Sequence, residues 1–168
     1  MLLRFVLLSL ALFNSCSAGP AANFATHQIM DVVESSVRSG NLEPILFLLD
    51  ADFNYSMCGY VGNKATFQGY MNSQMSSLVD IQFLTDFDNA SIEEKDGKEY
   101  LTFHVDTKAI YMDRTRVEGG ATVTAAKKQY GAMFYISNIV QRCRNTVKRH
   151  HRLYRLFTNE NLYDYRKK

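Results

Sequence analysis

The first part of the chain has the apolar spacing of helices. Apolar residues three and four positions apart predict a helix over residues 24–38, and Gly40 ends it. A second, shorter helix is predicted over residues 42–49. Pro44 suits the first turn of this helix, because no intrahelical hydrogen-bond donor is lost there. Two helices are therefore expected before the first extended segment.

A strand and a third helix are predicted next. Residues 52–58 alternate between polar and apolar side chains, which is typical of a strand. Gly59 and Gly62 bracket a predicted turn. Asn63 is a candidate N-cap for a third helix that runs to Met75, since an asparagine side chain can accept a hydrogen bond from the first helical turn.

From Val79 onwards the apolar residues recur at every second position, which is the period of a half-buried strand. Four long antiparallel strands are predicted. They run from Val79 towards Glu94, from Tyr100 to a turn at Asp113-Arg114-Thr115, from Val117 to Ala126, and from Gly131 to Cys143. Asp96-Gly97 joins the first two strands, because this dipeptide supplies the positive φ that a tight type I′ turn requires.

The last predicted strand is apolar on both faces. Its faces consist of Met133, Tyr135 and Ile139 on one side and of Phe134, Ile136 and Val140 on the other. Both are expected to be covered, as in a central strand or a strand at an oligomer interface. The second set is expected to give the outer face of the sheet apolar content, which favours a homodimer through the sheet. Gly119-Gly120, in the preceding strand, is interpreted as a bulge or bend.

Three helices, one early strand and a meander of four strands indicate an α+β architecture. A long sheet twists and curls, and the helices must cover its concave face to bury their own apolar sides. We therefore expect three N-terminal helices packed on the concave face of a strongly curved antiparallel sheet. Such a molecule is cone-shaped, with a cavity at its wide end.

This order of elements resembles the nuclear transport factor 2-like superfamily, which includes ketosteroid isomerase and scytalone dehydratase. The resemblance covers residues 24–143 and includes the helix-to-strand join at residues 48–53, Leu-Leu-Asp-Ala-Asp-Phe. The chain also resembles a small secreted branch with an early Cys58-Gly59 and a cysteine, Cys143, at the end of the last strand.

Residues 1–18 have the pattern of a secretory signal peptide. Arg4 supplies positive charge, an apolar run follows, and small residues precede Ala18. The apolar run is too short to cross a bilayer core of about 30 Å. We predict cleavage after Ala18, a secreted chain without a transmembrane segment, an α+β domain over residues 19–143 and a basic tail over residues 144–168.

Two cysteines, Cys58 and Cys143, remain after the signal peptide is removed. In an oxidising compartment, a lone pair of thiols in one domain most simply forms a disulfide, here across a loop of about 85 residues. A nucleophilic cysteine would need a base beside it, and no histidine is near either cysteine in the sequence until His150. The two cysteines lack zinc-like spacing, so no metal site is predicted.

Two acceptor sequons survive in the mature chain, at Asn54-Tyr55-Ser56 and Asn89-Ala90-Ser91. Asn89 lies in a polar segment, and export makes it the stronger candidate for glycosylation. Asn54 lies inside an apolar strand pattern, where a glycan would need an outward face to occupy.

The charge of the chain is uneven. The formal net charge is +2, but residues 142–168 hold nine Lys or Arg against two acids. A segment this basic can attract heparin-like sugars or anionic lipid; alternatively, it is a solvated extension that neutralises an acidic body. The candidate polyanion-binding residues are Arg142, Arg144, Lys148, Arg149, Arg152 and Arg155.

No catalytic set emerges from the sequence. By resemblance, a proton-shuttling isomerase would need a carboxylate base and a hydroxyl or protonated acid that faces an oxyanion. The weak candidates are Asp52, Tyr55 and His104, followed by Asp106 and Tyr135. The alternation places His104 on the outer surface, opposite the apolar face of its strand. A dehydratase of the scytalone type would need two inward histidines and an acid, and this set cannot be assembled.

Six tyrosines are candidates to line a ligand pocket, because tyrosine combines an apolar body with a hydrogen-bonding tip. They are Tyr55, Tyr60, Tyr70, Tyr100, Tyr111 and Tyr135. Alternatively, they are sheet residues chosen for their high β preference.

The leading hypothesis is a secreted, non-enzymatic domain without a cofactor that binds a small apolar ligand or a protein partner, through its cone cavity or its sheet face. One alternative is an enzyme of the isomerase or dehydratase type that uses a cavity acid and tyrosine. A second is a protein that binds extracellular polyanions through its tail. Intracellular nucleic acid is not expected as a partner of an exported chain.

Overall fold

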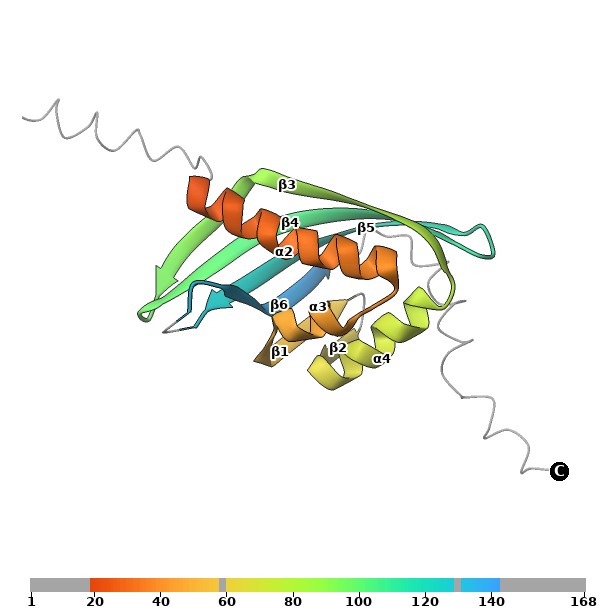
Figure 1. The fold of residues 1–168 in the computed structure, drawn as a ribbon, viewed down its shortest axis with the longest axis horizontal. Helices are drawn as coiled ribbons and strands as arrows, with labels where there is room; N and C mark the ends of the chain where they lie inside the picture. The colour runs from red at the N-terminus through yellow and green to blue at the C-terminus, as the bar shows by residue number, and fades with distance from the viewer. Residues whose placement is uncertain (1–18, 58–59, 129–130, 143–168) are drawn as a thin grey trace, which may run out of the picture.

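The computed structural model describes residues 19–57, 60–128 and 131–142 (Figure 1). Its helices are α2 (Pro20–Ser39), α3 (Glu43–Leu48) and α4 (Lys64–Met75). Its strands are β1 (Leu49–Met57), β2 (Tyr60–Asn63), β3 (Leu78–Lys95), β4 (Lys98–Tyr111), β5 (Arg116–Lys127) and β6 (Phe134–Arg142).

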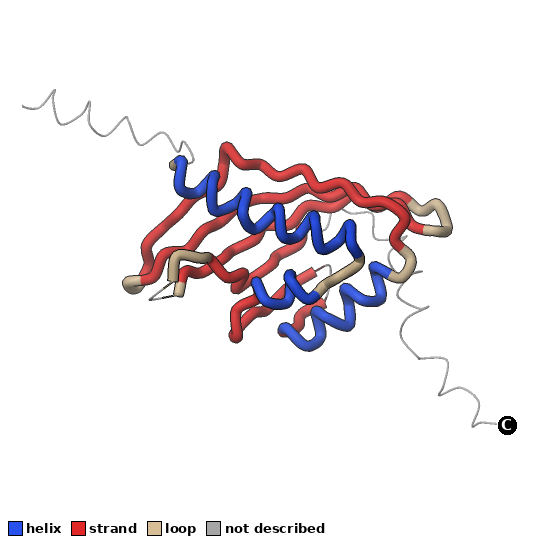
Figure 2. Tube along the Cα trace, in the orientation of Figure 1, coloured by secondary structure: helices blue, strands red, loops and turns tan. Residues whose placement is uncertain are grey.

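Within these residues the strands form one curved sheet in the order β2-β1-β6-β5-β4-β3. The meander from β3 to β6 is antiparallel, whereas β1 pairs in parallel with β6. Figure 2 shows the helices together in front of the curved strands, with α2 running across the sheet. The fold is α+β and cone-like, as the sequence predicts, and β6 is a central strand between β1 and β5.

The predicted third helix and its cap are confirmed. The Asn63 side chain accepts hydrogen bonds from the backbone N–H groups of Ala65 and Thr66, at 3.1 and 3.3 Å. The backbone N–H of Asn63 donates in turn to Thr66 Oγ1, at 2.9 Å. This capping box fixes the start of α4. By contrast, α2 begins at Pro20, earlier than predicted, because proline is well suited to the first helical position.

The predicted turn after the first strand is wrong in part, since residues 60–63 form the edge strand β2. Gly62 lies opposite Tyr55 in the register between β1 and β2. A Cβ atom at Gly62 would lie 2.2 Å from Thr66 Oγ1 and 2.7 Å from the Tyr55 ring. Glycine here is therefore explained by close packing, and four residues are too few to show a strand period.

The predicted hairpin between β3 and β4 is confirmed. Asp96 and Gly97 both have positive φ, at 54° and 72°. These values match a type I′ turn, which suits the twist of the flanking strands.

The predicted faces of the last strand are wrong beyond Ile136. The register with β5 shifts between Thr124 and Ala125, and one extra residue of β6, Ser137, lies at this bulge. Phe134 and Ile136 are buried, at 8% and 3% exposed, so they do not belong to the outer face. After the bulge, Ile139 turns to the core and Val140 is 40% exposed. Of the three apolar residues expected outside, one lies there.

The core lies between the helices and the inner face of the sheet. Leu101, Phe103 and Val105 of β4 are at most 5% exposed, and they alternate with outward residues as predicted. They pack with Ile29 and Met30 of α2 in one cluster of buried side chains.

Several predictions concern residues outside the described ranges. These are the signal peptide, both cysteines and every tail residue after Arg142. None of the described helices is both long and apolar enough to cross a membrane.

Candidate functional site

Three tyrosines and a glutamine meet between α4 and the inner face of the sheet; we call them the tyrosine cluster. They are Tyr55 of β1, Tyr70 and Gln74 of α4, and Tyr111 at the end of β4. The rings of Tyr55 and Tyr70 have centroids 6.4 Å apart. The Tyr111 hydroxyl donates a hydrogen bond to Gln74 Oε1, at 2.8 Å. The cluster thus joins a helix to two separate strands.

The hydroxyls of Tyr70 and Tyr111 resist ionisation. Burial, followed by the proximity of Tyr111 and then of Tyr55, raises the pKa of Tyr70 to about 12. Burial also raises the pKa of Tyr111. In both cases, removal from water disfavours the phenolate. Both hydroxyls therefore carry their protons near neutral pH and can donate hydrogen bonds.

Local packing holds the cluster in place. Phe67 is the buried residue of α4, and its ring lies 5.2 Å from that of Tyr55 and 5.1 Å from that of Phe53. Tyr70 and Gln74 follow Phe67 on neighbouring helical turns, so they share its side of α4. Nearby, Met71 and Met75 are half-buried against the core. Methionine side chains adapt to irregular shapes. Met71 and Met75 can therefore repack beside the tyrosine cluster.

The other candidate tyrosines lie elsewhere. Tyr60 of β2 is half-buried against the core. Tyr100 and Tyr135 are both register partners of Ala126, on the outer face of the sheet. Lys128 Nζ lies 4.2 Å from the centroid of the Tyr135 ring, a cation–π contact. Three of the six candidates therefore meet in the cluster, and two lie on the opposite face.

Gly119-Gly120 forms no bulge, because β5 pairs with β4 without a register shift there. The glycines instead make room for side chains of neighbouring strands. On the inner face, a Cβ at Gly119 would lie 2.7 Å from Gln141 Nε2. On the outer face, a Cβ at Gly120 would lie 2.5 Å from Asp106 Oδ1 and 3.1 Å from His104 Nε2.

The weak catalytic candidates do not come together. Asp52 is exposed on β1, whereas Tyr55 is buried in the cluster. His104 lies on the outer face, as the alternation predicts, with Nε2 3.4 Å from Asp106 Oδ1. In the described part of the chain, the buried polar side chains are Thr26 and Ser36, so no acid or histidine is buried there. The interior therefore lacks a described carboxylate base.

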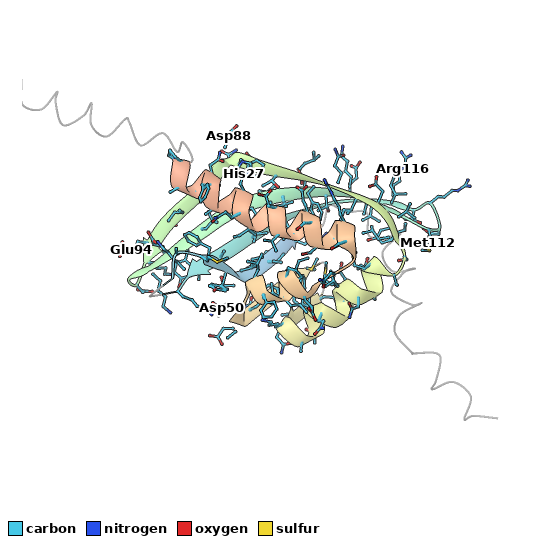
Figure 3. The ribbon with its side chains drawn as sticks, in the orientation of Figure 1. His27, Asp50, Asp88, Glu94, Met112 and Arg116 are labelled. Carbon is cyan, nitrogen blue, oxygen red and sulfur yellow. The ribbon has the colours of Figure 1, made fainter. Side chains whose placement is uncertain are left out.

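The remaining described histidine, His27, lies on α2. Its ring stacks on that of Phe87, with centroids 3.8 Å apart. Figure 3 shows His27 close to Asp88 at one edge of the molecule, whereas Met112 and Arg116 lie at the far end of the β4–β5 hairpin. No three His, Cys, Asp or Glu side chains gather as a metal site within the described ranges.

A small pocket lies away from the tyrosine cluster. It has a volume of about 20 Å³ and is lined by Ala25, Gln28, Ile29, Leu48, Met133 and Phe134. This volume suffices for about one water molecule. A larger ligand would need side chains of the interior to move.

The two cysteines can be placed only through their described neighbours, whereas both sequons lie within the described residues. Cys58 and Cys143 lie outside the described residues. Met57, one residue before Cys58, and Gln141, two residues before Cys143, are register partners on β1 and β6. Asn89 is exposed, and its side-chain amide donates to Asp86 Oδ2 at 2.7 Å. The predicted bridge and sugars remain predictions.

Sequence reasoning missed two polar residues of the interior. Gln74 lies four residues after Tyr70, which is the spacing of one helix face. Thr107 lies on the inner face of β4 opposite Gly119, whose carbonyl oxygen accepts a hydrogen bond from Thr107 Oγ1 at 3.3 Å. Gln74 could have been identified from its helical spacing. The partner of Thr107 could not, because it depends on the register between β4 and β5.

No protein-family model and no curated protein matches this sequence. Solved structures do match its fold. A candidate scytalone dehydratase from Novosphingobium aromaticivorans is 11% identical, with a TM-score of 0.57 over 70% of this chain and 80% of that one. A candidate ketosteroid isomerase from Shewanella frigidimarina is 15% identical, with a TM-score of 0.52 over 70% and 94% of the two chains.

A third similar structure is a nuclear transport factor 2-like protein of unknown function from Exiguobacterium. It is 10% identical, with a TM-score of 0.52 over 73% of this chain and 99% of that one. Such identities carry information about the fold alone. Together with the curved sheet and its helices, they show that the chain has the nuclear transport factor 2-like fold.

Proposed function

We propose that this protein is an exported, non-enzymatic domain that binds a small, neutral and largely apolar molecule at its tyrosine cluster. The observation that carries the proposal is the meeting of Tyr55, Tyr70 and Tyr111 between α4 and the sheet. Binding sites for small molecules are mostly apolar with a few placed polar groups. The cluster has this composition.

The chemistry of the cluster favours a neutral ligand with a hydrogen-bond acceptor. Burying an unpaired charge is costly, and the cluster itself contains neither an acid nor a base to pair with one. The protonated hydroxyl of Tyr70 can donate to a carbonyl, ether or hydroxyl oxygen. The Tyr111 hydroxyl can do the same once its hydrogen bond to Gln74 Oε1 is broken. The apolar remainder of the ligand would contact the adaptable side chains of Met71 and Met75.

Entry of the ligand would displace α4. This helix has one buried residue, Phe67, and is anchored to the sheet through the Tyr111–Gln74 hydrogen bond. A segment with few buried contacts opens at low free energy. Movement of α4 would therefore provide the space that the small pocket beside α2 does not.

The test is native mass spectrometry and thermal shift with neutral sterols, long-chain alcohols and ketones, beside charged analogues of each. We expect a neutral ligand to bind, and Tyr70→Phe or Tyr111→Phe to weaken it about five-fold, because one hydrogen bond contributes about 1 kcal/mol. Tyr135→Phe, on the outer face, is the matched control. A control that weakens binding equally, or failure of every neutral compound to bind, would contradict the proposal.

A further inference from the structure

A band of short, uncharged side chains crosses the outer face of the sheet. The strand registers place its members side by side, one from each strand. In spatial order they are Asn63, Asn54, Asn138, Thr124, Thr102 and Ser91. All six carry an amide or a hydroxyl.

A second row runs beside the first. It consists of Val61, Ser56, Val140, Thr122 and His104, and it reaches an acid at Asp86 on the edge strand β3. Neither row contains Lys or Arg, and Asp86 is the one acidic residue in the two rows. Charged side chains instead follow towards the β4–β5 hairpin, where Lys108 and Glu118 are register partners. The two rows, which we call the polar band, thus form a distinct surface.

Asn54 lies in this band, and its sequon is presented outwards. Its chain neighbours Phe53 and Tyr55 are 1% and 4% exposed on the inner face, so the alternation of the strand turns Asn54 to solvent. Asn54 and Ser56 are both exposed. The apolar strand pattern that argued against this sequon therefore describes the inner face alone.

We propose that Asn54 carries an N-linked oligosaccharide that covers the polar band. The donor is an oligosaccharide linked to a polyprenyl diphosphate, which the secretory pathway supplies. A bond forms between Asn54 Nδ2 and C1 of the first sugar, and the bond between C1 and the diphosphate oxygen breaks. Polyprenyl diphosphate leaves, and one amide proton passes to a base of the transferase.

The composition of the band favours a sugar over a second copy of the chain. The core of a dimer interface is more apolar than the remaining surface. Here the large apolar side chains are Val61 and Val140, since Phe134 and Ile136 are buried in the core. Amides and hydroxyls can hydrogen-bond the hydroxyls of a sugar. A glycan and a flat dimer contact cannot occupy Asn54 at once.

The first test is the mass of the full chain secreted from eukaryotic cells with its own residues 1–18. Wild type should lose two oligosaccharides on enzymatic deglycosylation. Ser56→Ala and Asn54→Gln should each carry one fewer than wild type, Asn89→Gln should lack the other, and Ser56→Thr, which keeps the sequon, should match wild type. Failure to be exported, or an unmodified Asn54, would overturn the proposal. Unmodified Asn54 in a dimer would assign the band to a second copy.

The second test asks whether the sugar covers the band. His104 lies three strands from β1, about 14 Å away, and diethyl pyrocarbonate acylates accessible histidines. We expect His104 to react more slowly in wild type than in Ser56→Ala, while His27 on α2 reacts equally in both. Equal rates at His104 would overturn the covering role even if Asn54 is modified. Neither test depends on ligand binding. The proposal of ligand binding at the tyrosine cluster can therefore be contradicted without affecting this one.

Discussion

Neighbouring residues of β4 face two different environments. Phe103 is 2% exposed against the helices, whereas the side chain of the next residue, His104, is 36% exposed on the outer face. The inner face combines aromatic rings with hydroxyls that ionise reluctantly. The outer face presents, within the polar band, short amides and hydroxyls. One set of strands thus separates an aromatic, largely buried interior from a polar surface.

The largest contrast between the faces should be in stability. Phe103→Ala should lower the free energy of unfolding by about 3–5 kcal/mol, because it removes a buried ring and leaves a cavity. Thr102→Ala, its outward neighbour, should change the free energy of unfolding by less than about 0.5 kcal/mol. Urea unfolding of both variants measures this. Equal losses would mean that the outer face is covered by something that the chain alone does not provide.

The second largest effect should be a loss of stability at alkaline pH, which arises from Tyr70 on the inner face. The pKa of Tyr70 in the folded chain, about 12, lies above the ordinary value of 10.0. Its contribution to stability is therefore fully present below pH 10 and is lost as pH rises through 12, since the unfolded chain ionises first. The loss is at most roughly 3 kcal/mol. Unfolding measured against pH, with Tyr70→Phe as the control, should show a smaller decline in the variant.

The paired glycines allow a finer comparison. Gly119→Ala should cost about 1–2 kcal/mol, because its Cβ must displace the half-buried Gln141 amide on the inner face. Gly120→Ala should cost less than about 1 kcal/mol, because Asp106 and His104 can move into solvent. Thermal unfolding of the two variants decides the order. If Gly120→Ala lost more stability than Gly119→Ala, His104 and Asp106 would be held more firmly than their exposure indicates.

The smallest expected effect is the coupling free energy between His104 and Asp106 on the outer face. His104 and Asp106 are 36% and 54% exposed, so their attraction is screened by water. A double-mutant cycle with His104→Asn and Asp106→Asn should give a coupling free energy below about 1 kcal/mol, and added salt should reduce it further. A larger coupling that salt does not change would point to a buried pair.

The sequence predicted the elements whose pattern repeats over many residues. The alternation from Val79 to Ala126 predicted three strands and Asp96-Gly97 predicted one hairpin, because both signals are local. β2 was missed because its four residues are too few to show a period. The bulge at Ser137 was missed because it depends on pairing with β5, which local sequence does not encode.

The candidate site was less accessible to prediction. Tyr55, Tyr70 and Tyr111 were identified by residue type, but six tyrosines qualified equally. Which of them meet depends on how α4 packs on strands that are distant in sequence. The sequence also could not show that the Asn54 side chain points outwards, because an apolar strand pattern does not reveal which of its residues are buried. Both answers required the register between strands.

The parallel pairing of β1 with β6 has a consequence for synthesis. β1 is made early, yet its inner neighbour in the sheet, β6, is the last strand that the structure describes. On the ribosome, the nascent chain must therefore hold β1, β2 and the aromatic face of α4 without their central partner until β6 emerges. Pairing across such a sequence distance is slow, and apolar surface is exposed meanwhile. A chain truncated before β6 should thus depend on chaperones far more than its remaining helices would indicate.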